Sequence, residues 1–381
     1  MKKIFKVVLG LLVLGFTYGA NAADNIKIGA LVAATGPASF LGDPELKTLE
    51  LYVDKINTEG GVLGKKLELV AYDTGASPKK ATTFVKRLIS QDKVVAILGG
   101  SASGETMAII PFIQRAKVPL VSMAGSIKIV QPVKSYVFKT PATDRMACQK
   151  IFEYLKSKSK TNIALISGNG GFGKSMRGQC KDVAPNYGIK ILADETYGPK
   201  DTDMTAQLTK IKNTANVQAV VNPGFGQGPA IVTKNFKQLG MTQTLVESHG
   251  VASKKYIELS GDASEGVIVA SPPVVVASLL ADSNPIKKVS LAYVKAYNNK
   301  YHTPTSTFGG YAYDALYLVV DAMKSAKSSD PKAIRDALEN TKDYVGLNGI
   351  YNMSKKDHLG LDLNSGIQML VIKNHDWALA N

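Results

Sequence analysis

The sequence predicts an α/β protein whose strands form mainly parallel sheets. Short apolar runs alternate with amphipathic helical segments from Ile26 onward, which is the pattern of strand–helix–strand units. Clusters of glycine and serine follow several of these runs, as expected where a strand turns into a helix. The alternation stops at residues 137–141 and then starts again. The chain of 381 residues is therefore expected to form two domains of similar build.

The first half of the chain supplies the strands and helices of one sheet. Apolar runs predict strands at residues 26–32, 67–72, 94–98 and 119–122. Helices are expected from Pro44, from Ser77 and over residues 105–116, because apolar residues recur there at helical spacing. Pro44 suits the first turn of the first helix, and Gly60-Gly61 suits the end of that helix.

After the boundary at residues 137–141 the same alternation predicts a second sheet. Helices are expected at residues 144–156 and from Gly173, Met204 and Gly228, with strands at residues 162–167, from Lys190, and at 219–222 and 244–247. A second boundary falls at residues 271–273. Long helices at 285–300 and 306–327 follow, and residues 366–373 alternate like an edge strand. The tyrosines at 311, 313 and 317 are expected mainly in the core, with one or two facing a cleft.

Two loops of small residues follow neighbouring strands of the first predicted sheet. Residues 99–104 end one strand, and residues 123–126 end the next. The carboxyl ends of parallel strands meet at one edge, where open α/β sheets bind small ligands. Serine hydroxyls and the free N–H groups of a helix start suit a carboxylate, so we expect a binding site there.

The first residues have the features of a secretory signal peptide. Three lysines precede an apolar run, and Ala20-Asn21-Ala22 forms a cleavage motif, so residues 1–22 are expected to be removed. The net charge of +15 comes from lysines that are scattered along the chain. For an exported protein this favours a solvated surface that mildly attracts anions, and we expect no nucleic-acid partner.

Two cysteines, Cys148 and Cys180, each lie in a predicted helix on either side of one strand. An oxidising compartment favours a disulfide between them, and two buried thiols are an equally good alternative.

Residues 168–175, GNGGFGKS, match the phosphate-loop pattern after a predicted strand. An exported protein meets few nucleotide triphosphates, and no strand ending in aspartate completes a magnesium site, so we treat the match as coincidental. Ser101 lacks the frame of a nucleophile elbow, and the four histidines have no metal-ligand spacing. We therefore expect no catalytic residue, no metal and no cofactor.

The chain resembles the type I periplasmic binding proteins of the branched-chain amino-acid group. The motifs that carry the resemblance are TGP at 35–37, INTEGGVLG at 56–64, YD at 72–73 and SEG at 264–266. The resemblance covers the mature chain and implies two Rossmann-like lobes. The backbone would pass from one lobe to the other three times. It places the crossings near Pro141, Ser271 and Leu347. One lobe would contain residues 23–141 and 272–347, and the other 142–271 and 348–381.

The same resemblance implies a set of ligand contacts. The ligand carboxylate would be held by Ser101 and by the loop of Ala124, Gly125 and Ser126. Walls around the ligand would come from four side chains, at Leu41, Phe172, Phe225 and Phe308.

Two departures from the family pattern affect these expectations. Ala76 and Gly100 stand where the family has a small disulfide. His249 stands where amino-acid binders place an acid for the ligand ammonium, with Glu247 two residues earlier. A histidine favours a ligand without an amino group, such as an aromatic or short aliphatic acid. Glu247 would restore an amino-acid site if it faced the cleft.

The resemblance thus implies a monomeric periplasmic receptor that passes a small carboxylate to the permease of an ABC importer. A true branched-chain amino-acid binder and a ligand-binding sensory module are the alternatives, and an enzyme is not expected.

Overall fold

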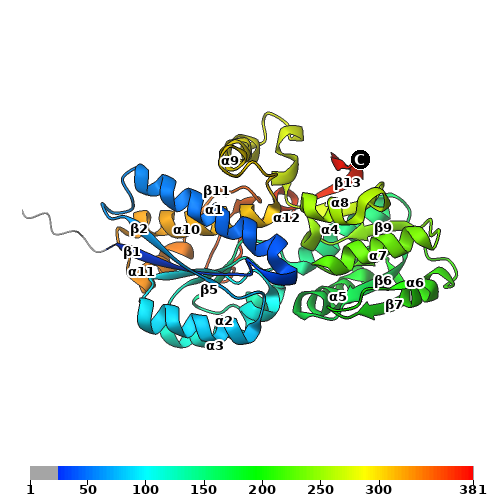
Figure 1. Ribbon diagram of the computed structural model, residues 1–381, viewed down its shortest axis with the longest axis horizontal. Helices are drawn as coiled ribbons and strands as arrows, with labels where there is room; N and C mark the ends of the chain where they lie inside the picture. The colour runs from blue at the N-terminus through cyan, green and yellow to red at the C-terminus, as the bar shows by residue number, and fades with distance from the viewer. Residues whose placement is uncertain (1–24, 381) are drawn as a thin grey trace, which may run out of the picture.

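The structure is a computed structural model that describes residues 25–380. The predicted signal peptide lies outside the described residues. Within residues 25–380, no helix combines the length and apolar character that a membrane span requires. The described chain forms two lobes that lie side by side, each built on its own sheet (Figure 1).

The first lobe contains a five-stranded sheet in the order β2-β1-β3-β4-β5, and all of its strand pairs are parallel. Its strands are β1 (Ile26–Val32), β2 (Leu67–Asp73), β3 (Ala96–Gly99), β4 (Leu120–Ser122) and β5 (Val137–Lys139). The sequence indicated four of these strands. It missed β5, because this three-residue strand coincides with the segment that we read as a boundary.

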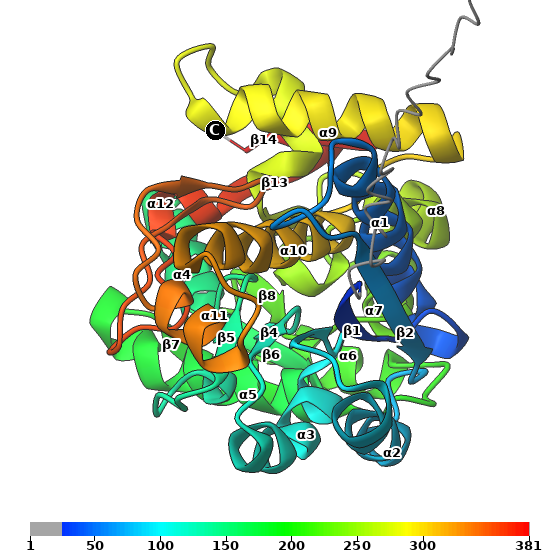
Figure 2. The same cartoon turned by 90° about the vertical axis from the view of Figure 1, so that its left-hand side faces the viewer.

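Helices cover both faces of the first sheet (Figure 2). They are α1 (Ser39–Thr58), α2 (Pro78–Arg87), α3 (Ser103–Ala116), α10 (Thr307–Ala326) and α11 (Pro331–Leu338). Helix α1 packs with α10, and α2 packs with α3. Helix α1 begins at Ser39 rather than at Pro44, so that Leu41 lies within its first turn.

The second lobe contains a seven-stranded sheet in the order β14-β13-β10-β9-β8-β6-β7. Its strands are β6 (Asn162–Gly168), β7 (Lys190–Tyr197), β8 (Ala219–Asn222), β9 (Thr244–Glu247), β10 (Ile268–Ser271), β13 (Gln368–Lys373) and β14 (Asp376–Leu379). Strands β13 and β14 pair antiparallel and the others parallel. The edge strand at this end is β14, not the segment 366–373 that the sequence predicted, because β13 is paired on both sides.

The helices of the second lobe come from the middle of the chain. They are α4 (Asp144–Ser157), α5 (Gly171–Val183), α6 (Thr205–Lys212), α7 (Gln227–Gln238) and α8 (Lys254–Ser260). Helix α9 (Pro285–Tyr301) packs on the segment 273–279 that precedes it and on α1. The remaining elements are β11 (Tyr344–Val345), β12 (Ile350–Tyr351) and α12 (Leu363–Gly366).

The chain passes between the lobes after β5, between β10 and α10, and between β12 and β13. Two of these passages are joined to α10 by Asp314. Its buried carboxylate accepts hydrogen bonds from the backbone N–H groups of Leu347 (2.7 Å) and Asn348 (3.1 Å). The Tyr351 hydroxyl lies within hydrogen-bonding distance of Asp314 Oδ2 (3.0 Å) and of the Thr140 carbonyl (2.9 Å). These contacts connect both passages to one helix of the first lobe.

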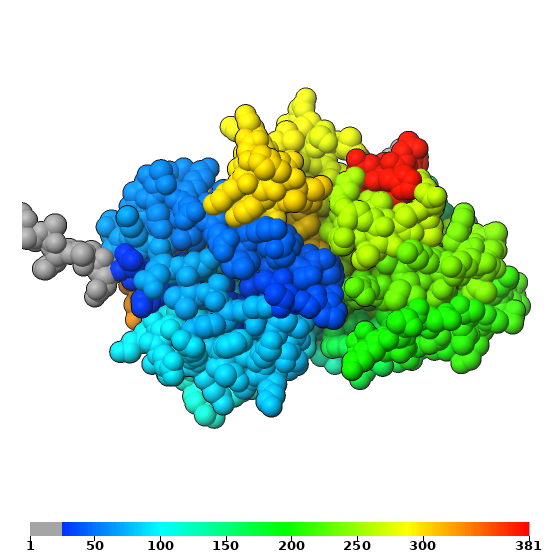
Figure 3. Space-filling model, viewed as in Figure 1, coloured from blue at the N-terminus to red at the C-terminus, as the bar shows by residue number. Residues whose placement is uncertain are grey.

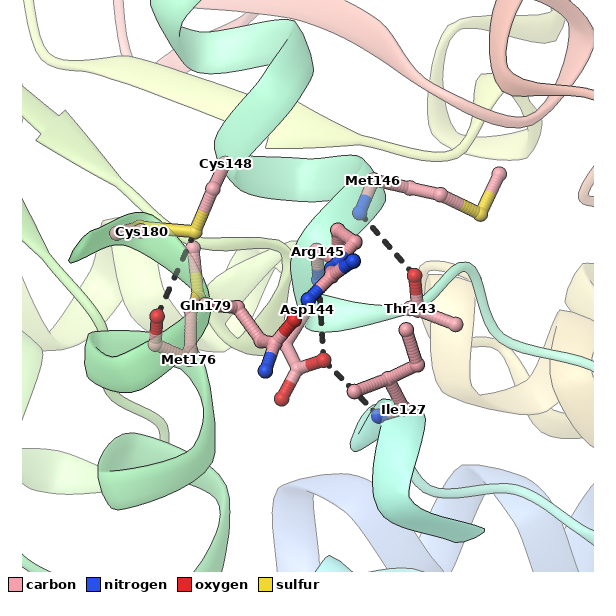
Figure 4. Close-up of a disulfide and its surroundings, with 9 residues drawn as sticks. All are labelled: Ile127, Thr143, Asp144, Arg145, Met146, Cys148, Met176, Gln179 and Cys180. Carbon is pink, nitrogen blue, oxygen red and sulfur yellow. Dashed lines mark hydrogen bonds between the residues drawn. A yellow bond between two sulfur atoms is a disulfide. The ribbon is translucent and has the colours of Figure 1, made fainter. Parts of the chain in front are cut away.

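Cys148 and Cys180 form a disulfide that joins α4 to α5 (Figure 4). Both cysteines are fully buried, and the second lies late in its helix. Of the two alternatives that the sequence left open, the structure has the disulfide. The bridge fixes α5 against α4, and the first turn of α5 faces the other lobe. Asp144, the first residue of α4, accepts the N–H of Ile127 at 2.9 Å.

Replacing both cysteines, as Cys148→Ala with Cys180→Ala, is expected to lower the free energy of unfolding by about 2–4 kcal/mol. The bridge spans 32 residues, and its loss gives the unfolded chain more freedom. Urea unfolding followed by circular dichroism measures the change. A reductant should bring the wild type to the stability of the double variant and leave the variant unaffected. Two titratable thiols in denatured, unreduced wild type would contradict the assignment.

Candidate functional site

A cavity lies between the lobes, where the carboxyl ends of strands from both sheets face each other. Phe172, His249 and Phe308, which line it, are buried, so the lobes are closed around it. Figure 3 shows the lobes in contact along their facing sides. The lining residues come from both lobes and are Leu41, Ser101, Ala102, Ser103, Met123, Gly125, Pro141, Phe172, Phe225, His249, Gly250, Phe308 and Tyr311.

The first lobe contributes Ser101 in the turn between β3 and α3. This side chain is buried, and its hydroxyl oxygen accepts the N–H of Ala33 at 2.9 Å. The same hydroxyl shares a hydrogen bond with the carboxyl group of Glu45 in α1. The first N–H groups of α3 follow directly, and a helix start carries partial positive charge. This turn therefore combines a hydroxyl with a positive helix end, which suits an anionic group.

The loop after β4 brings Gly125 to the cavity, while Ala124 and Ser126 are not among its lining residues. The Ser126 hydroxyl lies 2.7 Å from the hydroxyl of Ser175 in α5. The Ser126 N–H donates to the Ser103 hydroxyl at 3.2 Å. The side chain of Ser126 thus connects the two lobes beside the cavity, which differs from the ligand contact that the sequence predicted.

Aromatic rings of the second lobe form the opposite wall. The ring of Phe172 packs edge-to-face on Phe225 (centroids 6.1 Å apart) and on the imidazole of His249 (5.2 Å). A Cβ atom placed on Gly125 would lie 2.7 Å from Phe172 Cε2 and 2.8 Å from His249 Nε2. Glycine at 125 therefore lets the rings of one lobe touch the backbone of the other. Phe308 of α10 adds a fourth ring, in contact with Phe40 and Tyr311.

His249 is buried, and neither ring nitrogen has a hydrogen-bond partner among residues 25–380. Burial, assisted by the charge of Lys139, lowers the pKa of His249 to about 3, so the imidazole is neutral at physiological pH. Lys139 is fully buried in β5, and its ammonium donates to the carbonyls of Gly125 (3.0 Å) and Ala142 (3.3 Å). Burial lowers the pKa of Lys139 to about 7, and the nearby Asp144 partly opposes this shift.

Glu247 points away from the cavity, into the second lobe. Its Oε1 accepts from the amide of Asn222 (3.1 Å) and from the hydroxyl of Thr233 (3.3 Å), in a cluster that includes Tyr197 and Tyr256. Burial raises the pKa of Glu247 to about 8, so its carboxyl group is mainly protonated at neutral pH. Of the two residues that the sequence left open, His249 lines the cavity and Glu247 does not.

The structure brings together seven of the nine residues that the sequence proposed for the ligand site. They are Leu41, Ser101, Gly125, Phe172, Phe225, His249 and Phe308. Sequence reasoning did not identify Glu45 and Lys139. The sequence pattern could have identified Glu45 as a buried acid, because it lies four residues after Leu41 on the apolar stripe of the helix that continues through Leu49 and Val53. The signal of Lys139 was hidden, because its short strand was not recognised.

The phosphate-loop pattern has a different role in the structure. Phe172 lines the cavity, Lys174 is exposed, and the Ser175 hydroxyl contacts Ser126. Within the described part of the chain, no group of three or more histidine, cysteine or acidic residues is arranged to hold a metal.

Comparison with known proteins identifies the fold and the family. The model of the family described as "Periplasmic binding protein" matches residues 25–366. The leucine-, isoleucine-, valine-, threonine- and alanine-binding protein of Pseudomonas aeruginosa is 25% identical over 339 residues, which are 88% of each chain. An extracellular ligand-binding receptor from Rhodopseudomonas palustris HaA2 has a TM-score of 0.87 and 27% identity, over 94% of this chain and 100% of that one.

A third relative was solved with a ligand. The branched-chain amino-acid transporter substrate-binding protein LivJ from Streptococcus pneumoniae, in complex with isoleucine, has a TM-score of 0.83 and 27% identity, over 94% of this chain and 99% of that one. These relatives are named as ligand-binding or substrate-binding proteins. The two-lobed fold, the cavity between the lobes and the match to nearly the whole described chain agree: this chain belongs to the periplasmic binding protein family.

Proposed function

We propose that this protein is the periplasmic receptor of an ABC importer and that it binds a small carboxylate without an amino group. The carboxylate would lie at the turn of Ser101 and the start of α3, where a hydroxyl and a positive helix end meet. Closure of the lobes would bury the ligand and present both lobes to the permease. The signal-peptide features of residues 1–22 support a periplasmic location.

The charges around the cavity support a ligand that lacks an ammonium group. A buried ammonium needs a nearby anion, because an unpaired charge is costly to remove from water. No aspartate or glutamate is among the lining residues, and the acid nearest in sequence to His249, Glu247, is hydrogen-bonded inside the second lobe. Lys139 adds a cation behind Gly125, which opposes a second positive charge. The observation that carries the proposal is that His249, and no acidic side chain, lies at this wall.

The shape of the cavity supports a flat apolar body on the ligand. Phe172, Phe225 and Phe308 surround it with ring faces and edges, and aromatic rings pack well against flat groups. His249 could hydrogen-bond a hydroxyl or carbonyl through either of its ring nitrogens. An aromatic acid or a 2-oxo acid has these features.

A branched-chain amino-acid ligand is the second candidate. The relatives from P. aeruginosa and S. pneumoniae carry names that refer to leucine, isoleucine or branched-chain amino acids. This candidate requires a counter-charge for the ammonium that the lining residues of this chain do not provide.

Benzoate-type acids or 2-oxo acids are expected to raise the melting temperature more than leucine, isoleucine and valine do at equal concentration. His249→Ala should weaken binding of the best acid by about 1–3 kcal/mol, because a buried hydrogen-bond partner is lost. Glu247→Gln should leave that affinity unchanged. Calorimetric titration measures both effects. Sub-micromolar leucine binding that Glu247→Gln abolishes and His249→Ala preserves would replace this proposal by the amino-acid one.

The pH dependence of stability checks independently that Glu247 is buried and protonated. Its folded-state pKa of about 8 exceeds the value in unfolded chains, so its contribution to stability is complete at low pH and is lost as the pH rises towards 8. Glu247→Gln should therefore become more stable relative to wild type between about pH 5 and pH 8. Thermal unfolding of both proteins across this range measures the difference, and a constant difference would contradict the assignment.

Gly125→Ala is expected to prevent full closure of the lobes. The added methyl group would meet Phe172 and His249 at less than 3 Å, and overpacking of this kind costs about 1–3 kcal/mol. Gly104→Ala is the matched control, because a Cβ atom there meets nothing within 4 Å. With saturating ligand, small-angle scattering should show a larger radius of gyration for Gly125→Ala than for Gly104→Ala. Equal radii and equal affinities would rule out this contact as the closing surface.

A further inference from the structure

Glu45 lies behind the cavity wall and contacts it only through Ser101. Its side chain is fully buried in α1, at the carboxyl end of the first sheet. Its Oε2 is hydrogen-bonded to the Ser101 hydroxyl, and its Oε1 has no hydrogen-bond partner among the residues that the structure describes. Tyr311 of α10 also lines the cavity, and burial together with the charge of Glu45 raises the pKa of its hydroxyl.

A second buried carboxyl group, that of Glu105 in α3, lies near Glu45. Glu105 accepts the N–H of Ala102 at 2.9 Å and the hydroxyl of Thr74. Glu45, in contrast, has Ser101 as its one hydrogen-bond partner in the described chain. None of the ion pairs within residues 25–380 includes either acid. The two carboxyl groups are hydrogen-bonded to adjacent residues, Ser101 and Ala102, so ionising both without a cation is unfavourable, and the acid with fewer donors keeps the proton.

The pKa directions agree with this geometry. Burial raises the pKa of Glu45 well above its ordinary value, and the charge of Glu105 raises it further, against the opposing hydrogen bond from Ser101. Burial also raises the pKa of Glu105, but only to about 6, because its hydrogen-bond donors oppose the shift. Around neutral pH the arrangement therefore favours a protonated Glu45 beside an ionised Glu105.

The state of Glu45 decides where the single proton of Ser101 points. The Ser101 oxygen already accepts the N–H of Ala33. An ionised Glu45 has no proton to give, so the Ser101 hydroxyl must donate to it and offers the cavity no donor. A protonated Glu45 donates to Ser101 instead. The Ser101 oxygen then accepts two hydrogen bonds, and its own O–H is free to donate into the cavity.

We propose that Glu45 is a positioning residue that must carry a proton for Ser101 to hold the ligand carboxylate, so that ligand binding is coupled to protonation of Glu45. This inference rests on the proposed function, namely that a carboxylate lies at Ser101. The inference adds a pH dependence to the proposed function. The affinity for the ligand decreases as the pH rises, because Glu45, behind Ser101, loses its proton. A ligand carboxylate at Ser101 would also be repelled by the negative charge of an ionised Glu45 on the other side of that hydroxyl.

The first experiment measures the dissociation constants of benzoate, 4-methyl-2-oxopentanoate and leucine by calorimetry from pH 5.5 to 8.5. All three carry a carboxylate that is ionised over this range, since carboxyl groups in water titrate near about 4. For wild type the dissociation constant should rise with pH, by at most tenfold per pH unit. Titrations in two buffers with different protonation enthalpies should show proton uptake on binding that increases with pH, up to one proton.

Glu45→Gln tests the assignment, because its side-chain amide always donates to Ser101, as a protonated acid does. Its dissociation constant should change less than twofold over the same range, without proton uptake. Glu50→Gln, on the exposed side of the same helix, changes the net charge equally and should keep the wild-type profile. His249 and Lys139 are unchanged in both variants, so their titration cancels in the comparison. Identical pH profiles for wild type and Glu45→Gln would overturn the inference.

A ligand-free measurement separates this inference from the proposed function. Because the folded-state pKa of Glu45 is raised, its protonated form stabilises the fold at low pH, and that stability is lost as the pH rises. The melting temperature of Glu45→Gln relative to wild type should therefore increase from pH 5.5 to 8.5, whereas that of Glu50→Gln should not. A difference independent of pH would overturn the inference. If no acid binds either protein at pH 5.5, the proposed function fails, and this result still decides the state of Glu45.

Discussion

The position of the two lobes depends on the buried carboxylate of Asp314. It receives hydrogen bonds from the backbone of Leu347, from Asn348 and from Tyr351, whose hydroxyl also approaches the carbonyl of Thr140. Burial raises the pKa of Asp314 to about 6, and its donors oppose that shift, so the group is mainly ionised at neutral pH. Two of the three passages between the lobes thus begin from one fixed point on α10. The cavity lies between the two lobes that these passages join.

The ionisable groups around the cavity share one property, which is that burial favours their neutral forms. Burial lowers the pKa values of His249 and Lys139 and raises those of Glu45 and Glu247. A closed cleft excludes the water that would otherwise stabilise these charges. The proposed carboxylate would therefore meet neutral hydrogen-bond donors, a helix start and aromatic rings. In the proposed function this lining disfavours groups that bring an unpaired positive charge.

Small residues of the first lobe make close contact across the cleft. Gly125 in the first lobe meets the rings of Phe172 and His249, and Ser126 meets Ser175 beside them. The disulfide between α4 and α5 keeps the helix that carries Phe172 and Ser175 against its neighbour. The second lobe therefore presents these side chains as a fixed surface, onto which the backbone of the first lobe closes.

The sequence by itself determined the α/β class and the two-sheet organisation, because apolar periodicity and loops of glycine and serine are local signals. The same signals pointed to the two loops that contain Ser101 and Gly125, and the resemblance to a known family supplied the other cavity residues. The sequence could not determine the direction of Glu247, since residues two apart share a face only while the strand continues, and the strand ends at Glu247, directly before the turn that carries His249. Only the tertiary structure showed that His249 meets the cavity while Glu247 points inward, and that Ser126 contacts Ser175. It alone placed Glu45 behind Ser101, because residues 56 positions apart meet only when a helix packs across the strand ends.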